Sequence, residues 1–143
     1  MDNETKYVLV TGATGQLGHD IVDELIKKNI PCIGVGSADL DITNGEAVSN
    51  FFNTHKIRFV YHSAGYTKVD DAETNIETNH AINVNGTKNI VAECDKYKIP
   101  MTFFSTDYVF DGNSFIPYTE SDKENPVSFR YKVAILGSLF LSL

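Results

Sequence analysis

Residues 8–18 read Val-Leu-Val-Thr-Gly-Ala-Thr-Gly-Gln-Leu-Gly. A run of β-forming residues leads directly into a glycine loop, and a segment with apolar residues at helical spacing follows at once. The N–H groups and the dipole at the start of such a helix attract an anion, and glycine lets a pyrophosphate approach the backbone. The spacing of Gly12, Gly15 and Gly18 is G-x-x-G-x-x-G, not the commoner G-x-G-x-x-G of dinucleotide sites. The stretch predicts a phosphate-binding strand–loop–helix unit; the alternative is a tight turn that holds no ligand.

Composition narrows the class of protein. The chain has 143 residues, 42% of them apolar, which suits one domain with a real core. Its net charge of −7 argues against nucleic acid or an anionic membrane as the main partner. Cys32 and Cys94 lie in apolar surroundings without metal-ligand spacing, which predicts two free, buried thiols and no metal site. The polar N-terminus is unlike a secretory signal peptide, so we expect a cytoplasmic protein.

Strand and helix patterns alternate along the chain. We predict three helices. The first covers 16–28, the second begins at Thr43, which would form a capping box with Glu46, and the third is a long helix that ends near Lys98. The apolar face of the first helix is predicted to hold Leu17, Ile21, Val22, Leu25 and Ile26. Strands are predicted at 7–11, 32–35, 58–63 and, as a buried strand, 101–105, with a brief strand or extended edge at 39–42. This alternation predicts an α/β fold, a Rossmann-like doubly wound parallel sheet.

Ligands of such sheets lie at the carboxyl ends of the strands, so these ends are interpreted as one surface. After the second strand come Gly36 and the small, neutral Ser37, with neither an acid that would select NAD nor an Arg that would select NADP. Asp41 and Ile42 could bracket an adenine, with the carboxylate near its amino group and the aliphatic side chain on its face. The alternative for Asp41 is a solvated turn residue.

Two further strand ends complete this surface. Ser63, Ala64 and Gly65 are small enough to let the backbone approach a ribose. Ser105, Thr106 and Tyr108 follow the last predicted strand. A hydroxyl there could stabilise the alkoxide that forms when a carbonyl accepts hydride, whereas Thr106 could also be a plain β-branched strand residue.

Several runs together resemble the dTDP-4-dehydrorhamnose reductases, extended short-chain dehydrogenases/reductases of deoxysugar synthesis. They are Thr11-Gly-Ala-Thr-Gly-Gln-Leu-Gly18, Ala38-Asp-Leu-Asp-Ile-Thr43, Tyr66-Thr-Lys-Val-Asp70, Ile82-Asn-Val-Asn-Gly-Thr87 and Phe104-Ser-Thr-Asp-Tyr-Val-Phe-Asp-Gly112. The Ser-Thr-Asp-Tyr-Val-Phe run is the most specific, because the glycine loop is shared by the whole superfamily. The resemblance covers about residues 6–129. It implies NADPH- or NADH-dependent reduction of dTDP-4-dehydro-L-rhamnose to dTDP-L-rhamnose, a nucleotide-sugar substrate.

The resemblance also implies roles for individual residues. The pyrophosphate would lie on Gly12, Gly15, Gln16 and Leu17, the adenine on Asp41 and Ile42, and the nicotinamide ribose on Ala64, Gly65 and Tyr66. Thr106 would be the hydroxyl member of the catalytic triad, Tyr108 would approach the sugar, and Thr67 and Val69 would border the substrate.

The family mechanism also needs a Tyr-x-x-x-Lys pair on the next helix, in which the Tyr protonates the alkoxide and the Lys lowers the pKa of that Tyr. Counting from Thr106, the pair should fall at positions 130 and 134, which are Arg130 and Ala134 here. Tyr131 and Lys132 are adjacent and cannot share a helix face.

The apolar residues after Phe129 have no amphipathic period and are too few for a membrane span of roughly 20 residues. We therefore expect residues 1–129 to form an incomplete NAD(P)-binding domain, and residues 130–143 to be an aberrant or truncated tail. The substrate-binding lobe would be missing. The exposed sheet edge would promote self-association.

Three functions remain open at this stage. The first is a nucleotide-sugar ketoreductase that lacks its proton donor. The second is a non-catalytic NAD(P)-binding module, as in the regulatory subunit of methionine adenosyltransferase, which shares the Ser-Thr-Asp-Tyr-Val-Phe run. The third is an epimerase or dehydratase of nucleotide sugars. The Tyr-Lys pair separates the first two.

Overall fold

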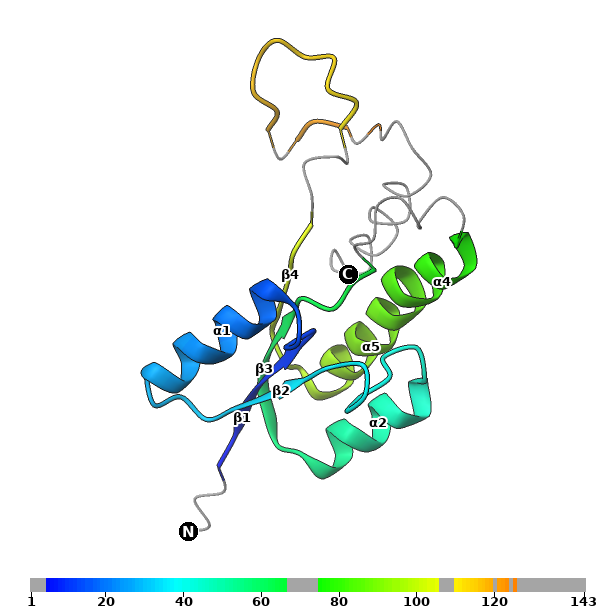
Figure 1. The fold of residues 1–143 in the computed structure, drawn as a ribbon. Helices are drawn as coiled ribbons and strands as arrows, with labels where there is room; N and C mark the ends of the chain where they lie inside the picture. Colours follow the sequence, from blue (N-terminus) through cyan, green and yellow to red (C-terminus); the bar gives the residue numbers. More distant parts are fainter. Residues whose placement is uncertain (1–4, 67–74, 106–109, 120, 124, 126–143) are drawn as a thin grey trace.

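In the computed structural model, residues 5–66, 75–105, 110–119, 121–123 and 125 are described. Four parallel strands form one sheet in the order β2-β1-β3-β4 (Figure 1). The strands are β1 (Tyr7–Thr11), β2 (Cys32–Val35), β3 (Ile57–His62) and β4 (Met101–Phe103). The helices are α1 (Gln16–Lys27), α2 (Gly45–Thr54), α4 (Ile76–His80) and α5 (Thr87–Tyr97), with a π-helical segment, η1 (Ala81–Gly86), joining the last two. The predicted doubly wound α/β fold is confirmed.

Two cores lie on opposite faces of the sheet. On one face, Val8 and Val10 of β1 pack with Leu25 of α1. On the other face, Leu9 of β1 and Val60 of β3 pack against residues of α2 and α5 (Figure 1). Because successive side chains of a strand point to opposite faces, the continuous apolar run of β1 supplies both cores.

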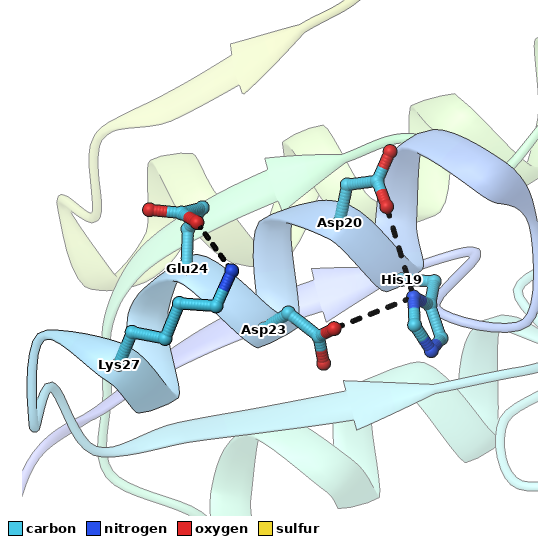
Figure 2. Close-up of polar contacts among 5 residues, drawn as sticks. All are labelled: His19, Asp20, Asp23, Glu24 and Lys27. Carbon is cyan, nitrogen blue, oxygen red and sulfur yellow. Dashed lines mark hydrogen bonds and ion pairs between the residues drawn. The ribbon is translucent and has the colours of Figure 1, made fainter.

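Fewer apolar residues of α1 face the sheet than its apolar pattern predicts. Ile21, Val22 and Leu25 face the sheet, whereas Leu17 and Ile26 are 45% and 60% exposed. Leu17 lies in the first turn of α1 and Ile26 in its last, and neither packs with the core residues of this face. The outer face carries charged residues, including the ion pair of Lys27 with Glu24 at 2.8 Å (Figure 2). Such exposed pairs contribute little to stability.

We predicted a brief strand or extended edge at 39–42, and the strand was wrong: these residues belong to the turn after β2. The carboxylate of Asp39 accepts a hydrogen bond from the Gly36 N–H at 2.9 Å, and that of Asp41 accepts one from the Thr43 N–H at 2.9 Å. These local bonds compete with sheet formation, which is why the segment turns.

The cap of α2 also differs from the prediction. Asn44, not Thr43, is the N-cap, and its side chain accepts from the Ala47 N–H at 3.1 Å. The Thr43 hydroxyl is bound instead by Asp41 at 2.7 Å, so the predicted capping box does not form.

Three further predictions need correction. The predicted long helix runs without a break over 76–97 and has Lys98 as its C-cap, but its middle, η1, is π-helical, and no apolar periodicity reveals the extra residue per turn. The predicted buried strand 101–105 ends at Phe103 and is half-buried, because β4 pairs only with β3 among the described strands. Cys94 is buried, but Cys32, on the edge strand β2, is only partly so; both thiols are free.

Candidate functional site

A pocket of about 270 Å³ opens at the carboxyl ends of β1, β2 and β3. Its walls are Gly12 and Thr14 of the glycine loop, the turn after β2 as far as Thr43, and Ala64 and Gly65 after β3. The chain leaves β1 toward β2 and later returns past β1 to β3, so the crevice lies at the topological switch point, where open parallel sheets bind ligands. The volume lies just below the roughly 300–1,000 Å³ of small-molecule sites, so a larger ligand would extend over the glycine loop.

Two of the loop glycines are required by the protein's own packing. Gly12 has a φ of +71°, and a Cβ there would lie 2.7 Å from the Ala64 nitrogen. A Cβ at Gly18 would lie 2.2 Å from the Gly12 oxygen. These glycines therefore press the loop against the end of β3 and against the start of α1.

Gly15 differs, because nothing in the described protein requires a glycine there. It is exposed and has a φ of −85°, and an added Cβ would come only within 3.4 Å of the Gly12 oxygen. Gly15 is the N-cap of α1, which has no side-chain cap and no acidic residue in its first turn. The first N–H groups of the helix, at Gln16 and Leu17, are thus left for an outside acceptor. This arrangement suits an anion lying directly on the backbone.

On the adenine side of the prediction, Asp41 and Ile42 both line the pocket. One Asp41 oxygen is occupied by the two hydrogen bonds from Thr43. Ile42 is 7% exposed and lies against Gly86, where a Cβ would come within 2.7 Å of its Cδ1 atom.

Sequence reasoning missed Asn89 of α5. Its side chain donates to the Ile42 carbonyl at 2.9 Å and to the Thr43 carbonyl at 3.3 Å, which holds this wall of the pocket to the helix. The only sequence signal for an asparagine that binds loop carbonyls in this way is its position on the buried side of a predicted helix.

Asn83 of η1 was also missed, and it holds the third wall. Its Oδ1 accepts from the Tyr66 N–H at 2.7 Å, and its Nδ2 donates to the Tyr66 carbonyl at 3.4 Å. The same Nδ2 donates to Asn79 at 2.6 Å. These bonds fix the backbone of Tyr66. Of the three residues predicted to hold a ribose, Ala64 and Gly65 line the pocket and Tyr66 does not.

A buried histidine connects the walls. His62 Nδ1 lies 2.7 Å from the Thr11 hydroxyl, and His62 Nε2 lies 3.0 Å from that of Thr87. The Thr11 oxygen also accepts from the Ala64 N–H at 3.3 Å, so it joins the ring to the backbone at the end of β3. Burial lowers the pKa of His62 to about 4, which keeps the ring neutral. Thr11 directly precedes Gly12, so this chain of bonds links the glycine loop to α5.

The remaining predicted residues lie outside the described part of the chain. They are Thr67, Val69, Thr106 and Tyr108, together with Arg130, Tyr131, Lys132 and Ala134. Among the described residues, no helix is both long and apolar enough to cross a bilayer.

Residues 6–139 match the family described as RmlD substrate binding domain. The chain belongs to this family. The match continues beyond Phe129, where the resemblance noted from the sequence stops. It covers the glycine loop and every pocket wall described above.

The chain is similar in sequence to a curated reductase and in fold to two solved reductase structures. A dTDP-4-keto-6-deoxy-D-glucose reductase of Streptomyces niveus is 36% identical over 84% of this chain and 42% of its own length. A crystal structure of a dTDP-4-dehydrorhamnose reductase from Clostridium acetobutylicum is 40% identical with a TM-score of 0.91, over 95% of this chain and 49% of that one. The corresponding reductase from Bacillus anthracis, in complex with NADP, is 29% identical with a TM-score of 0.91, over 99% and 51%. The chain thus spans about half the length of the relatives it matches.

Proposed function

We propose that the chain is the dinucleotide-binding half of a dTDP-4-dehydrorhamnose reductase. The reaction would be reduction of dTDP-4-dehydro-L-rhamnose by NADPH or NADH to dTDP-L-rhamnose, a precursor of cell-surface polysaccharide. One observation carries the proposal: the uncapped start of α1, with Gly15 open above it, borders a pocket at the switch point of the sheet. Family membership and the names of the relatives support the same reaction.

The described residues fit the cofactor. An added Cβ at Gly15 would occupy space that the protein itself leaves open, and the α1 N–H groups of Gln16 and Leu17 suit a pyrophosphate. Gly12 lets this loop pack directly on the backbone of Ala64. Asp41 and Ile42 would hold the adenine, and Ala64, Gly65 and Tyr66 the nicotinamide ribose. When bound, reduced nicotinamide supplies the hydride.

The proton side of the reaction rests on residues outside the described part. Thr106 would donate a hydrogen bond to the substrate carbonyl oxygen, Tyr108 would approach the sugar, and Thr67 and Val69 would border it.

A second candidate function is cofactor binding without turnover. Arg130 and Ala134 stand where the proton-donating Tyr and its Lys are expected, and this favours a non-catalytic NAD(P)-binding module. On this interpretation residues 1–129 bind the cofactor without contributing a proton donor.

We make the same proposal for the partners and the location of the chain. A nucleotide sugar is the expected small-molecule partner, and the acidic chain is not expected to bind nucleic acid or a membrane. We place it in the cytoplasm. Among the described strands β4 pairs only with β3, and this half-buried edge is expected to promote self-association, so a monodisperse monomer in sedimentation would contradict this part.

Two assays on one preparation test the function. Calorimetric titration with NADPH and NADH should show saturable binding to the chain. Oxidation of either cofactor in the presence of dTDP-4-dehydro-L-rhamnose, followed by absorbance, then separates the two candidates. Binding with turnover supports the reductase, binding without turnover supports the module, and the absence of binding refutes both.

A further inference from the structure

The end of β2 carries a carboxylate that the order of residues conceals. Gly36 and Ser37 follow the strand directly, and neither is acidic. The turn then folds back, and the Oδ2 atom of Asp39 accepts from the Gly36 N–H at 2.9 Å. The acid is therefore at the strand end, although it comes three residues later in the chain.

This carboxylate stands beside the pocket. Gly36 and Ser37 line the pocket, and a Cβ on Gly36 would lie 3.5 Å from Asp39 Oδ2. Asp39 is exposed, and among the described residues no hydrogen bond reaches its other carboxylate oxygen. Asp41, a second carboxylate, also lines the pocket and keeps one oxygen without a described partner.

The described walls of the pocket contain no balancing cation. Asp41 is the one charged residue among them, and none is Lys, Arg or His. The local charge is therefore negative on the side of the pocket that faces β2.

We propose that Asp39 makes this site select NADH over NADPH. The inference rests on the proposed function, which places the adenine at Asp41 and Ile42 and the pyrophosphate at Gly15. The adenosine ribose then lies between them, next to Gly36 and Ser37. A 2′-hydroxyl can donate to the Asp39 carboxylate, whereas a 2′-phosphate would add negative charge beside two carboxylates without a described cation.

This chain would differ from a relative in the cofactor that it prefers. The Bacillus anthracis reductase was crystallised with NADP. Similarity at 29% identity leaves the residues that surround the 2′ position free to differ. Cofactor choice is thus a property of this turn rather than of the shared fold.

The test compares ligands that differ only at the 2′ position. Dissociation constants are measured by calorimetry for NADH and NADPH, and for adenosine 5′-phosphate and adenosine 2′,5′-bisphosphate, so the readout does not depend on turnover. The chain should bind the ligand without the 2′-phosphate about tenfold more tightly in each pair. The ratio should shrink as ionic strength rises, because salt screens exposed charges.

Variants assign the effect to Asp39. Asp39→Asn keeps an oxygen for the Gly36 N–H but removes the charge, so the ratio should fall toward one. Adding Ala38→Arg to it should favour the 2′-phosphate. Asp20→Asn, on the exposed face of α1, makes the same change in net charge and should leave the ratio unaltered (Figure 2).

Each outcome decides the inference. Equal affinities in the unmodified chain, or tighter NADPH binding, would overturn it. A preference for NADH that survives Asp39→Asn would overturn the assignment to Asp39. Binding of neither dinucleotide would refute the proposed function and the inference with it, and is distinguished by the first titration alone.

Discussion

His62 should make the stability of this chain depend on pH. The ring is 1% exposed and stacks near Phe103, with ring centroids 5.8 Å apart, and both its nitrogens are held by threonine hydroxyls. Protonating it would place a charge in the core and would remove the one acceptor that the neutral ring offers to a threonine hydroxyl. The unfolded chain has no such restriction and takes up the proton near the ordinary pKa of 6.5.

The size of the effect follows from the two pKa values. A pKa lowered from 6.5 to about 4 means that the unfolded state binds more protons between these values. The free energy of unfolding therefore falls as the pH drops through this window, by about 2.5 kcal/mol between pH 8 and pH 4.5. That is a large part of the 5–15 kcal/mol typical of a folded domain.

The assay is urea unfolding followed by circular dichroism at pH 8 and pH 4.5. His62→Asn removes the titrating group and keeps a polar side chain, so its loss of stability over this range should be smaller than that of the unmodified chain by about 2.5 kcal/mol. The variant should also be less stable at pH 8, by about 1–3 kcal/mol, because hydroxyls lose their partners.

A control histidine and a lower pH limit of 4.5 assign the pH dependence to His62 rather than to other titrating groups. His19→Asn makes the same substitution at a side chain that is 66% exposed on α1, so it is the matched control outside the core (Figure 2). Asp111 stays outside the window: hydrogen bonds from the Asn113 backbone, Asn125 and Tyr118 lower its pKa to about 2, so its contribution is lost only below its ordinary 3.8. Equal pH dependence in the unmodified chain and His62→Asn would refute the reasoning.

Four further substitutions test the site and its supports. Gly15→Ala should change the free energy of unfolding by less than about 1 kcal/mol but weaken NADH binding at least about tenfold in calorimetry, because its methyl group enters the pyrophosphate space. Gly18→Ala should instead lower the melting temperature strongly, since its Cβ would lie 2.2 Å from the Gly12 oxygen; unaltered melting would contradict that packing. Asn44→Ala should cost about 1 kcal/mol in urea unfolding through loss of the α2 cap, with Thr43→Ala, which removes no cap, as comparison. Asn89→Ala should weaken binding of adenosine 5′-phosphate, because the Ile42 and Thr43 carbonyls lose their donor; unchanged affinity would count against the proposed adenine wall.

Local sequence patterns were enough to predict the strands and helices that are defined by apolar periodicity. β1, β2 and the helical character of α1, α2 and α5 follow from residues whose spacing alone decides which face is buried. The glycine loop was also predictable, because a strand, three glycines and a helix adjoin in sequence. Thr106 and Tyr108 were singled out by motif, and their roles remain predictions.

Tertiary structure decided what depends on contacts distant in sequence. Asn83 and Asn89 hold the pocket walls through bonds to Tyr66, Ile42 and Thr43, and no local pattern pairs these residues. The π-helical segment that carries Asn83 has no signature in apolar spacing either.

The glycine loop and the turn after β2 show the division most clearly. Sequence alone determined that a phosphate should lie on the start of α1, because the N–H groups, the dipole and the glycines are properties of one continuous stretch. Only the folded chain distinguished Gly15, open to a ligand, from Gly12 and Gly18, which are tightly packed. Only the fold placed Asp39 at the end of β2, since a side-chain hydrogen bond reverses the chain there. Sequence order specifies which groups are present, whereas the charge that a ligand meets depends on where the turn brings them.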